Sequence, residues 1–160
     1  MTEGAAHERS LAEPAFPGDD GSIDPALEAA AGQPNQMLAA FGTARVFVPV
    51  VAILGERATD GSDKNAEMAA VMITSSAGRT ALLTFTSVAA MAVWDPQARP
   101  VPVYGRDAAR AALADECGAM LLDLGSAAMQ VIDTDDMQHI ADEHVLVQTP
   151  DGRTAWVAPA

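Results

Sequence analysis

Positive charge is scarce in this chain of 160 residues, which has nine lysine and arginine residues against 22 aspartate and glutamate residues. The net charge is −13, and Lys64 is the only lysine. A chain this acidic repels phosphate backbones and anionic lipid headgroups. The composition therefore argues against nucleic acid and membrane surfaces as partners, and favours a protein partner, with a basic one the better match.

Cysteine is almost absent as well. Cys117 stands alone, so no internal disulfide can form and nothing indicates an oxidising compartment. The first residues carry Glu3, His7 and Glu8 and lack the apolar core of a signal peptide. The uncharged run 80–94 is too short to span a bilayer. We therefore expect a cytoplasmic protein.

Several sequence motifs of catalysis are missing. The chain has neither of the glycine-rich phosphate-binding patterns, GxxxxGK[ST] and GxGxxG, and it has no GxSxG nucleophile elbow. The candidate nucleophiles Ser75, Ser76 and Ser126 fall in predicted turns, where serine is favoured for local hydrogen bonding. The sequence thus predicts no catalytic residue of these classes, and a small serine-dependent hydrolase is only an alternative.

A thiol enzyme is the second form of that alternative. Cys117 could be activated by His139 or His144, which are the nearest histidines in the sequence. However, we expect Cys117 at the C-terminal end of a helix beside Glu116, where the helix dipole and the neighbouring charge disfavour a thiolate. We therefore interpret Cys117 as a structural residue.

Metal ligands are also too few for a recognisable site. Asp133, Asp135 and Asp136 are close in sequence and His139 follows one turn later, but no glycine completes a calcium loop. His139 and His144 are five residues apart and should not share a helix face. Capping of a helix explains the aspartates, so we expect no metal site and no cofactor.

The clearest pattern that is present lies between residues 68 and 105. Two apolar runs of strand length, 69–73 and 80–85, flank Gly78, which tolerates a positive φ, and this predicts a β-hairpin. Ser87 can cap a short helix that Asp95-Pro96 ends.

The remaining elements follow from apolar periodicity and from capping residues. Helices are predicted over 25–32, 35–41, 88–94, 106–116 and 134–143, with Gly118 as the C-cap of the fourth. Strands are predicted over 45–54, 100–104, 119–124 and 129–132, and in a second hairpin over 144–157. Pro49 predicts a bulge or an edge position in the first strand, and the prolines of 100–104 predict an edge. Residues 55–67 are polar and predict an exposed loop.

Together these elements predict one α/β (or α+β) domain over residues 23–160, with a mixed sheet of about five to seven strands and helices packed on it. Residues 1–22 are rich in glycine, proline, alanine and acids, which predicts a disordered acidic leader. That leader could dock a partner or only improve solubility.

The central pattern resembles a known family. The order of Gly78 in a hairpin, Phe85-Thr86-Ser87, Trp94 and Arg99-Pro100, with a first strand like Val46–Val50, resembles the N-terminal domain of the SseB family, the enhanced serine sensitivity proteins, in its actinobacterial form. The resemblance covers roughly residues 35–145. It implies a fold and no catalytic residue or cofactor, because the family has no settled reaction. Larger members carry a second, C-terminal domain, for which this chain is too short.

Two features suggest an interaction surface. Trp94 could pack in the core or line the rim of a protein-binding groove. Residues 115–151 contain nine acids and no lysine or arginine, which gives either a solvated face or a patch that steers a basic partner. The candidate surface comprises Trp94, Asp133, Asp135, Asp136, Asp142 and Glu143. We expect a non-catalytic accessory or protein-interaction domain, and it is possible for the chain to form a homodimer.

Overall fold

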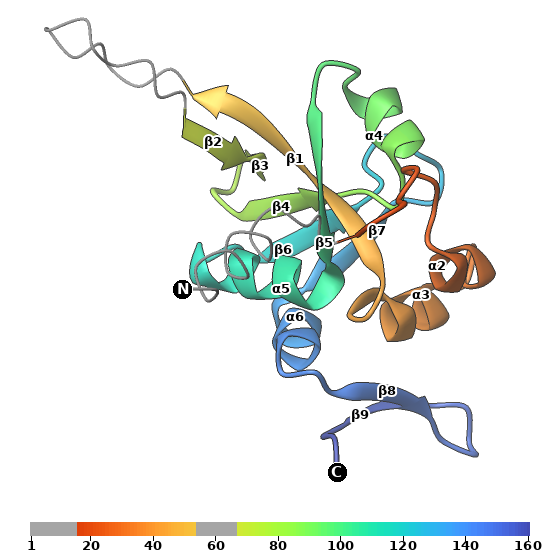
Figure 1. Cartoon of the computed structure of the whole chain (residues 1–160). Coiled ribbons are helices and arrows are strands. Elements are labelled where there is room, and N and C mark those ends of the chain that lie inside the picture. The colour runs from red at the N-terminus through yellow and green to blue at the C-terminus, as the bar shows by residue number, and fades with distance from the viewer. Residues whose placement is uncertain (1–15, 54–66) are drawn as a thin grey trace, which may run out of the picture.

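The computed structural model describes residues 16–53 and 67–160, which form one α+β domain, as the sequence predicts (Figure 1). Its helices are α2 (Pro25–Ala29), α3 (Pro34–Phe41), α4 (Val88–Trp94), α5 (Gly105–Ala114) and α6 (Thr134–Ala141). Its strands are β1 (Arg45–Ile53), β2 (Glu67–Ala70), β3 (Met72–Thr74), β4 (Thr80–Thr84), β5 (Arg99–Tyr104), β6 (Ala119–Leu122), β7 (Gln130–Asp133), β8 (Val145–Gln148) and β9 (Thr154–Val157). The predicted loop over 55–67 lies almost wholly outside the described residues.

The strands are divided among three sheets. A three-stranded sheet has the order β2-β1-β5, a four-stranded sheet has the order β3-β4-β6-β7, and β8 pairs only with β9. The four-stranded sheet is mixed, because β4 and β6 are parallel while its other pairs are antiparallel. Phe47 on β1 and Phe85 exchange two backbone hydrogen bonds of 2.8 Å, so these contacts join the two larger sheets.

Three prolines fit this arrangement because of the strand register. Pro100 lies opposite Pro49 and Pro102 lies opposite Phe47 across the β1–β5 pair. The N–H of Phe47 is directed to Phe85 and not to β5. In an antiparallel pair such positions alternate with hydrogen-bonded ones, so Pro102 opposite Phe47, and Pro49 and Pro100 two residues along, occupy positions that need no N–H between β1 and β5. β5 is an edge strand, as predicted. Pro49 instead lies in the middle strand, where its carbonyl accepts from the N–H of Val71.

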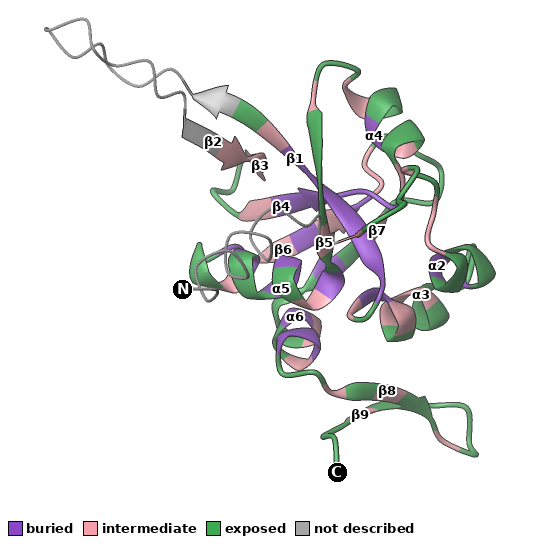
Figure 2. Cartoon of the chain, in the orientation of Figure 1, coloured by how far each residue is buried: buried purple, intermediate pink, exposed green. Residues whose placement is uncertain are grey.

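Buried residues are concentrated on β1 and β4 in the middle of the domain (Figure 2). The buried side chains form two clusters on opposite faces of the four-stranded sheet. Because successive residues of a strand point to opposite faces, Leu82 belongs to the larger cluster and Leu83 to the smaller one. The larger cluster lies beneath α3, α5 and α6, and the smaller one lies beneath α4. The junction between β5 and α5 has no space for a side chain at Gly105, because a Cβ there would lie 1.9 Å from the carbonyl oxygen of Phe41.

The ends of the helices are set by named caps. Asp24, Ser87 and Asp133 each accept a hydrogen bond from a backbone N–H of the helix that follows, as expected for N-caps. The C-terminal end of α5 differs from the prediction. Glu116, and not Gly118, takes the left-handed conformation (φ 58°) that closes the helix, and the N–H of Gly118 is donated to Thr80.

Residues 16–22, the last part of the predicted leader, contact the domain. The buried guanidinium of Arg45 forms an ion pair of 2.9 Å with Asp19 and also donates to the carbonyl oxygens of Ser22 and Thr86. The N–H of Val88 donates to the carbonyl oxygen of Gly21 at 2.9 Å. The domain therefore begins before residue 23, and residues 1–15 lie outside the described part of the chain.

Candidate functional site

The junction between α6 and the C-terminal hairpin holds a pair of histidines. Glu143 takes the left-handed conformation (φ 60°), and the N–H of His144 donates to the carbonyl oxygen of His139 at 2.9 Å. This is the Schellman way of ending a helix, which brings together two residues five positions apart. Here it places Nδ1 of His139 2.8 Å from Nδ1 of His144.

The two histidines do not share a helix face, as expected, because His144 lies beyond the end of α6, yet their rings meet. That expectation considered only helical spacing, in which residues five apart diverge. It missed the chain reversal at the end of α6, because Glu143 carries no sequence signal for the left-handed conformation. A glycine at that position would have revealed the reversal.

Trp156 completes the junction from the hairpin side. Its indole stacks on the imidazole of His139, with ring centroids 5.3 Å apart and an interplanar angle of 12°. Its Nε1–H donates to Oδ1 of Asp136 at 2.9 Å, and its ring packs against the main core. Trp156 therefore holds the hairpin β8–β9 against α6, which Figure 1 shows next to each other.

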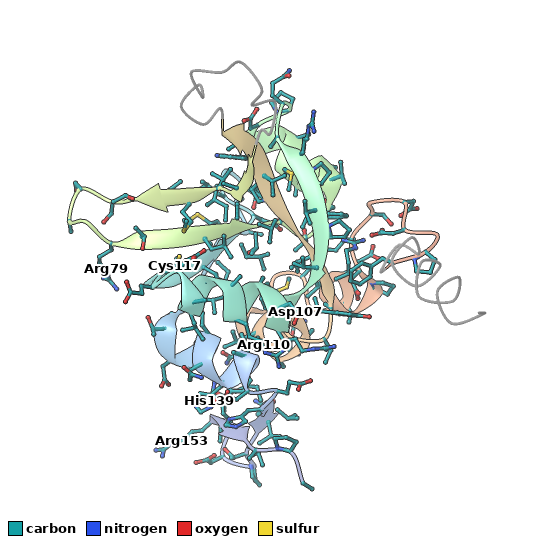
Figure 3. The ribbon with its side chains drawn as sticks, turned by 60° about the vertical axis from the view of Figure 1, so that its left-hand side comes forward. Arg79, Asp107, Arg110, Cys117, His139 and Arg153 are labelled. Atoms are coloured by element: carbon teal, nitrogen blue, oxygen red, sulfur yellow. The ribbon has the colours of Figure 1, made fainter. Side chains whose placement is uncertain are left out.

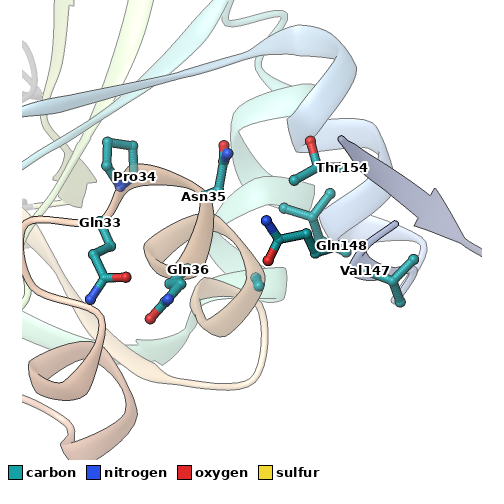
Figure 4. A pocket seen from close by; sticks show the side chains of 9 residues that line it. Gln33, Pro34, Asn35, Gln36, Val147, Gln148 and Thr154 are labelled. Atoms are coloured by element: carbon teal, nitrogen blue, oxygen red, sulfur yellow. The ribbon is translucent and has the colours of Figure 1, made fainter. Parts of the chain in front are cut away.

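A groove separates α3 from β8. Its first part, a hollow of about 340 Å³, is lined by uncharged side chains, four of which are carboxamides (Figure 4). Its second part, a hollow of about 450 Å³, includes Arg106, Glu143, His144 and Trp156 in its lining. Both parts are lined by Ala39, so they are neighbouring sections along the same helix.

The other face of the hairpin is apolar and exposed. Val145 pairs with Val157 and Val147 pairs with Ala155, so these four side chains share one face of the two-stranded sheet. Val145 is 55% exposed, Val147 is 38% exposed and Val157 is 48% exposed. Such a clustered apolar face is typical of a surface that another molecule covers.

The predicted acidic residues lie together on α6 and at its two ends, but their surroundings differ. Asp133 caps the helix, and Asp136 binds Trp156. Glu143 lies 3.5 Å from Arg106 and 3.4 Å from Arg110, so its charge is offset by partly exposed ion pairs.

Asp135 and Asp142 are exposed acids of this set that form no ion pair with an arginine or lysine of the described residues. Oδ2 of Asp135 lies 3.9 Å from Nε2 of His139, and the Asp135 side chain is 86% exposed. Asp142 accepts one hydrogen bond of 3.1 Å from Gln138 and is exposed. These two side chains therefore present negative charge to solvent on α6 and at its C-terminal end.

Trp94 is not part of this region. It ends α4, at the opposite end of the molecule from the hairpin (Figure 1). Its ring is half-buried and stacks on Phe85, with centroids 5.6 Å apart and an interplanar angle of 29°. Its position is intermediate between the two alternatives that the sequence left open, because it covers the smaller core and retains an exposed side.

Among the residues that the structure describes, no histidine lies within hydrogen-bond distance of Cys117. Cys117 is buried and its Sγ lies 3.4 Å from Sδ of Met72, whereas His139 and His144 bind each other. Burial, reinforced by the charge of Asp115, raises the pKa of the Cys117 thiol, which makes it less reactive. Cys117 and His139 lie in separate parts of the fold (Figure 3).

Ser75 and Ser126 form hydrogen bonds within their own turns. Oγ of Ser75 accepts from the N–H of Arg79, and Oγ of Ser126 accepts from the N–H of Ala128, both within their own turns. Within residues 16–53 and 67–160, no three histidine, cysteine or acidic side chains gather in a way that could hold a metal ion. No helix in those same ranges is long and apolar enough to cross a membrane.

The architecture defines a single α+β domain with a mixed sheet and an appended C-terminal hairpin. A family model described as SseB protein N-terminal domain matches residues 23–139. The chain belongs to this family, and the match agrees with the resemblance over roughly residues 35–145. No curated protein and no solved structure matches the chain. The hairpin, residues 145–157, lies beyond the matched residues.

Proposed function

We propose that this domain is a non-catalytic, cytoplasmic accessory domain that binds a basic protein partner through the outer face of the β8–β9 hairpin and the acids of α6. The observation that carries this proposal is the exposed apolar face formed by Val145, Val147, Ala155 and Val157. A protein interface combines apolar and polar contacts, and Asp135 and Asp142 add exposed negative charge on α6 and at its C-terminal end, the helix on which Trp156 of the hairpin packs.

The charge of the chain supports a basic partner. The net charge is −13, and residues 115–151 carry nine acids with no lysine or arginine. Complementary charge accelerates association more than it slows dissociation. The partner should therefore carry lysine or arginine residues around an apolar contact, and it should associate faster at low salt.

The alternative, a small thiol- or serine-dependent hydrolase, gains no support from the described residues. Its thiol form requires a histidine beside Cys117, and its serine form requires a base beside a serine such as Ser75 or Ser126. Cys117 instead lies beside Met72, and the two serines bond within turns. We therefore place the function in binding.

The test is a measurement of association rates for the full chain with the basic protein that it captures from its host. Asp135→Asn and Asp142→Asn should each slow association several-fold at low salt and leave dissociation nearly unchanged. Glu28→Gln, which removes an equal charge from an exposed position on α2, should have little effect. Association rates that do not change with salt concentration and are the same for all three variants would refute the proposal that the acids of α6 steer the partner.

A further inference from the structure

We propose that the second hollow, which lies between α3, the C-terminal end of α6 and the hairpin, binds a free α-amino acid with a large apolar side chain. Its lining combines one positive charge, one negative charge and apolar walls. Small-molecule sites are typically hollows of about 300–1,000 Å³ with apolar walls and a few polar groups, and this one has about 450 Å³. The inference goes beyond the proposed function, because it concerns a different ligand and does not use Asp135 or Asp142.

The walls of the hollow are apolar and come from segments far apart in the chain. They are formed by Leu38, Ala39, Ile140, Val145, Trp156 and Pro159. Ile140 belongs to the main core, and Leu38 and Trp156 pack against it, so the fold holds these walls in place. Because burial of apolar surface is favourable, such walls favour an apolar side chain over a polar one of the same size.

Arg106 supplies the positive charge. Its backbone N–H donates to the carbonyl oxygen of Gly42 at 3.0 Å, and its guanidinium carbon lies 4.4 Å from the centroid of the Tyr104 ring. The side chain is only 27% exposed, yet within residues 16–53 and 67–160 its guanidinium forms no hydrogen bond. A guanidinium presents a planar set of donors that fits a carboxylate. Arg106 is therefore held in place with donors available to a ligand.

Glu143 supplies the negative charge. Its Oε1 lies 3.5 Å from Nε of Arg106, and its Oε2 lies 3.4 Å from a terminal nitrogen of Arg110. Both distances exceed the length of a charge-assisted hydrogen bond, which is about 2.7–2.9 Å. The carboxylate of Glu143 is therefore able to accept hydrogen bonds from an ammonium group while it remains near both arginines.

The two charges are adjacent, as they are in an α-amino acid. In that ligand a single carbon separates the ammonium nitrogen from the carboxylate carbon, so the two atoms are about 2.5 Å apart. The ligand's carboxylate can face Arg106 while its ammonium faces Glu143, and each charge then meets its opposite. A ligand with only one of these charges would also meet a like charge. A zwitterion, moreover, adds no net charge to a chain whose net charge is −13.

The experiment titrates the full chain with L-leucine and follows the indole N–H signals of the two tryptophans by NMR. Trp156 lines the hollow and Trp94 lies at the opposite end of the molecule, so only the Trp156 signal should shift (Figure 1). Leucine amide lacks the carboxylate and N-acetylleucine lacks the ammonium, so each should bind about tenfold more weakly than leucine. Asparagine, which is close to leucine in size but has a polar side chain, should also bind about tenfold more weakly.

Protein variants assign each charge to its partner. Arg106→Gln should weaken leucine binding about tenfold. Arg99→Gln, which removes an equal charge from an exposed position on β5, should not weaken it. Glu143→Gln should weaken leucine binding but not the binding of N-acetylleucine, which has no ammonium for Glu143 to contact. If a variant disturbs the fold, the series of ligands still decides the question with the unaltered protein.

Three outcomes would overturn the inference. An unchanged Trp156 signal at millimolar leucine would show that the hollow does not bind it. Equal shifts of the Trp156 and Trp94 signals would show that the effect is not specific to this site. Equal affinities for leucine, leucine amide and N-acetylleucine would show that Arg106 and Glu143 do not bind the ligand's charges. In each case, slower partner association of Asp135→Asn would leave the proposed function standing.

Discussion

Nδ1 of His139 and Nδ1 of His144 lie 2.8 Å apart, so one ring must donate a hydrogen to the other. The contact links α6 to the first strand of the hairpin across a chain reversal at Glu143. Because the stacked ring of Trp156 also rests on His139, the position of the hairpin depends on this pair.

The first prediction concerns the energy of that pair. His139→Ala and His144→Ala should each destabilise the protein, and a double-mutant cycle should give a coupling free energy of about 1 kcal/mol, as for a part-buried hydrogen bond. Denaturant unfolding of the four proteins measures it. Free energies of unfolding that are additive within about 0.3 kcal/mol would show that the rings do not interact.

The second prediction places the start of the folded domain. Deletion of residues 1–15 should leave Tm within about 2 °C, whereas deletion of residues 1–22 should lower it by about 10 °C, because it leaves the buried guanidinium of Arg45 without Asp19. Calorimetry of the two truncated chains measures both shifts. Equal Tm values would mean that the contacts of residues 16–22 contribute no stability.

The third prediction concerns Trp94. Trp94→Ala should destabilise the protein by about 2–3 kcal/mol, less than the usual 3–5 kcal/mol for a fully buried aromatic side chain, because the ring is half-buried against Phe85. Trp94→Phe retains the stacking and should cost less. Unchanged stability together with loss of partner binding would instead identify Trp94 as a contact residue.

The fourth prediction concerns Cys117 and pH. Burial raises the pKa of its thiol, so alkylation in the native protein should stay slow at pH values where an exposed thiol already reacts. The folded state favours the neutral thiol, so the neutral thiol adds to the free energy of unfolding. This contribution is fully present below the pKa of the thiol in the unfolded chain, and it is lost as pH rises through the pKa of the thiol in the folded protein. Fast alkylation at neutral pH would contradict this, and Cys117→Ser should leave partner binding intact.

The predictable part of the fold was the part with strong local signals. Ser87 with its apolar helix, the Gly78 turn, the second hairpin and the Asp133 cap appear where the sequence predicts them, because each depends on residues adjacent in the chain. The strand predicted over 69–73 is instead divided between β2, which pairs with β1, and β3, which pairs with β4. The division of the strands into separate sheets depends on the long-range contact between Phe47 and Phe85, which no local pattern encodes.

The candidate site was only partly predictable for the same reason. The acids of α6 could be recognised from charge alone. The left-handed turns at Glu116 and Glu143 could not, because glutamate rarely adopts that conformation and tertiary contacts must favour it here. The groove between α3 and β8 joins segments about a hundred residues apart, so its carboxamides gave no common signal in the sequence.

The most direct test of the proposed binding surface is site-specific photo-cross-linking. A photoreactive p-benzoylphenylalanine replaces Val147 on the outer face of the hairpin in one protein and Val93 on α4 in the other. Val93 is 73% exposed and lies at the opposite end of the molecule (Figure 1). Our account predicts an adduct with a basic protein from position 147 only, and its yield should fall as salt rises. No adduct from position 147, or equal adducts from both positions, would contradict it.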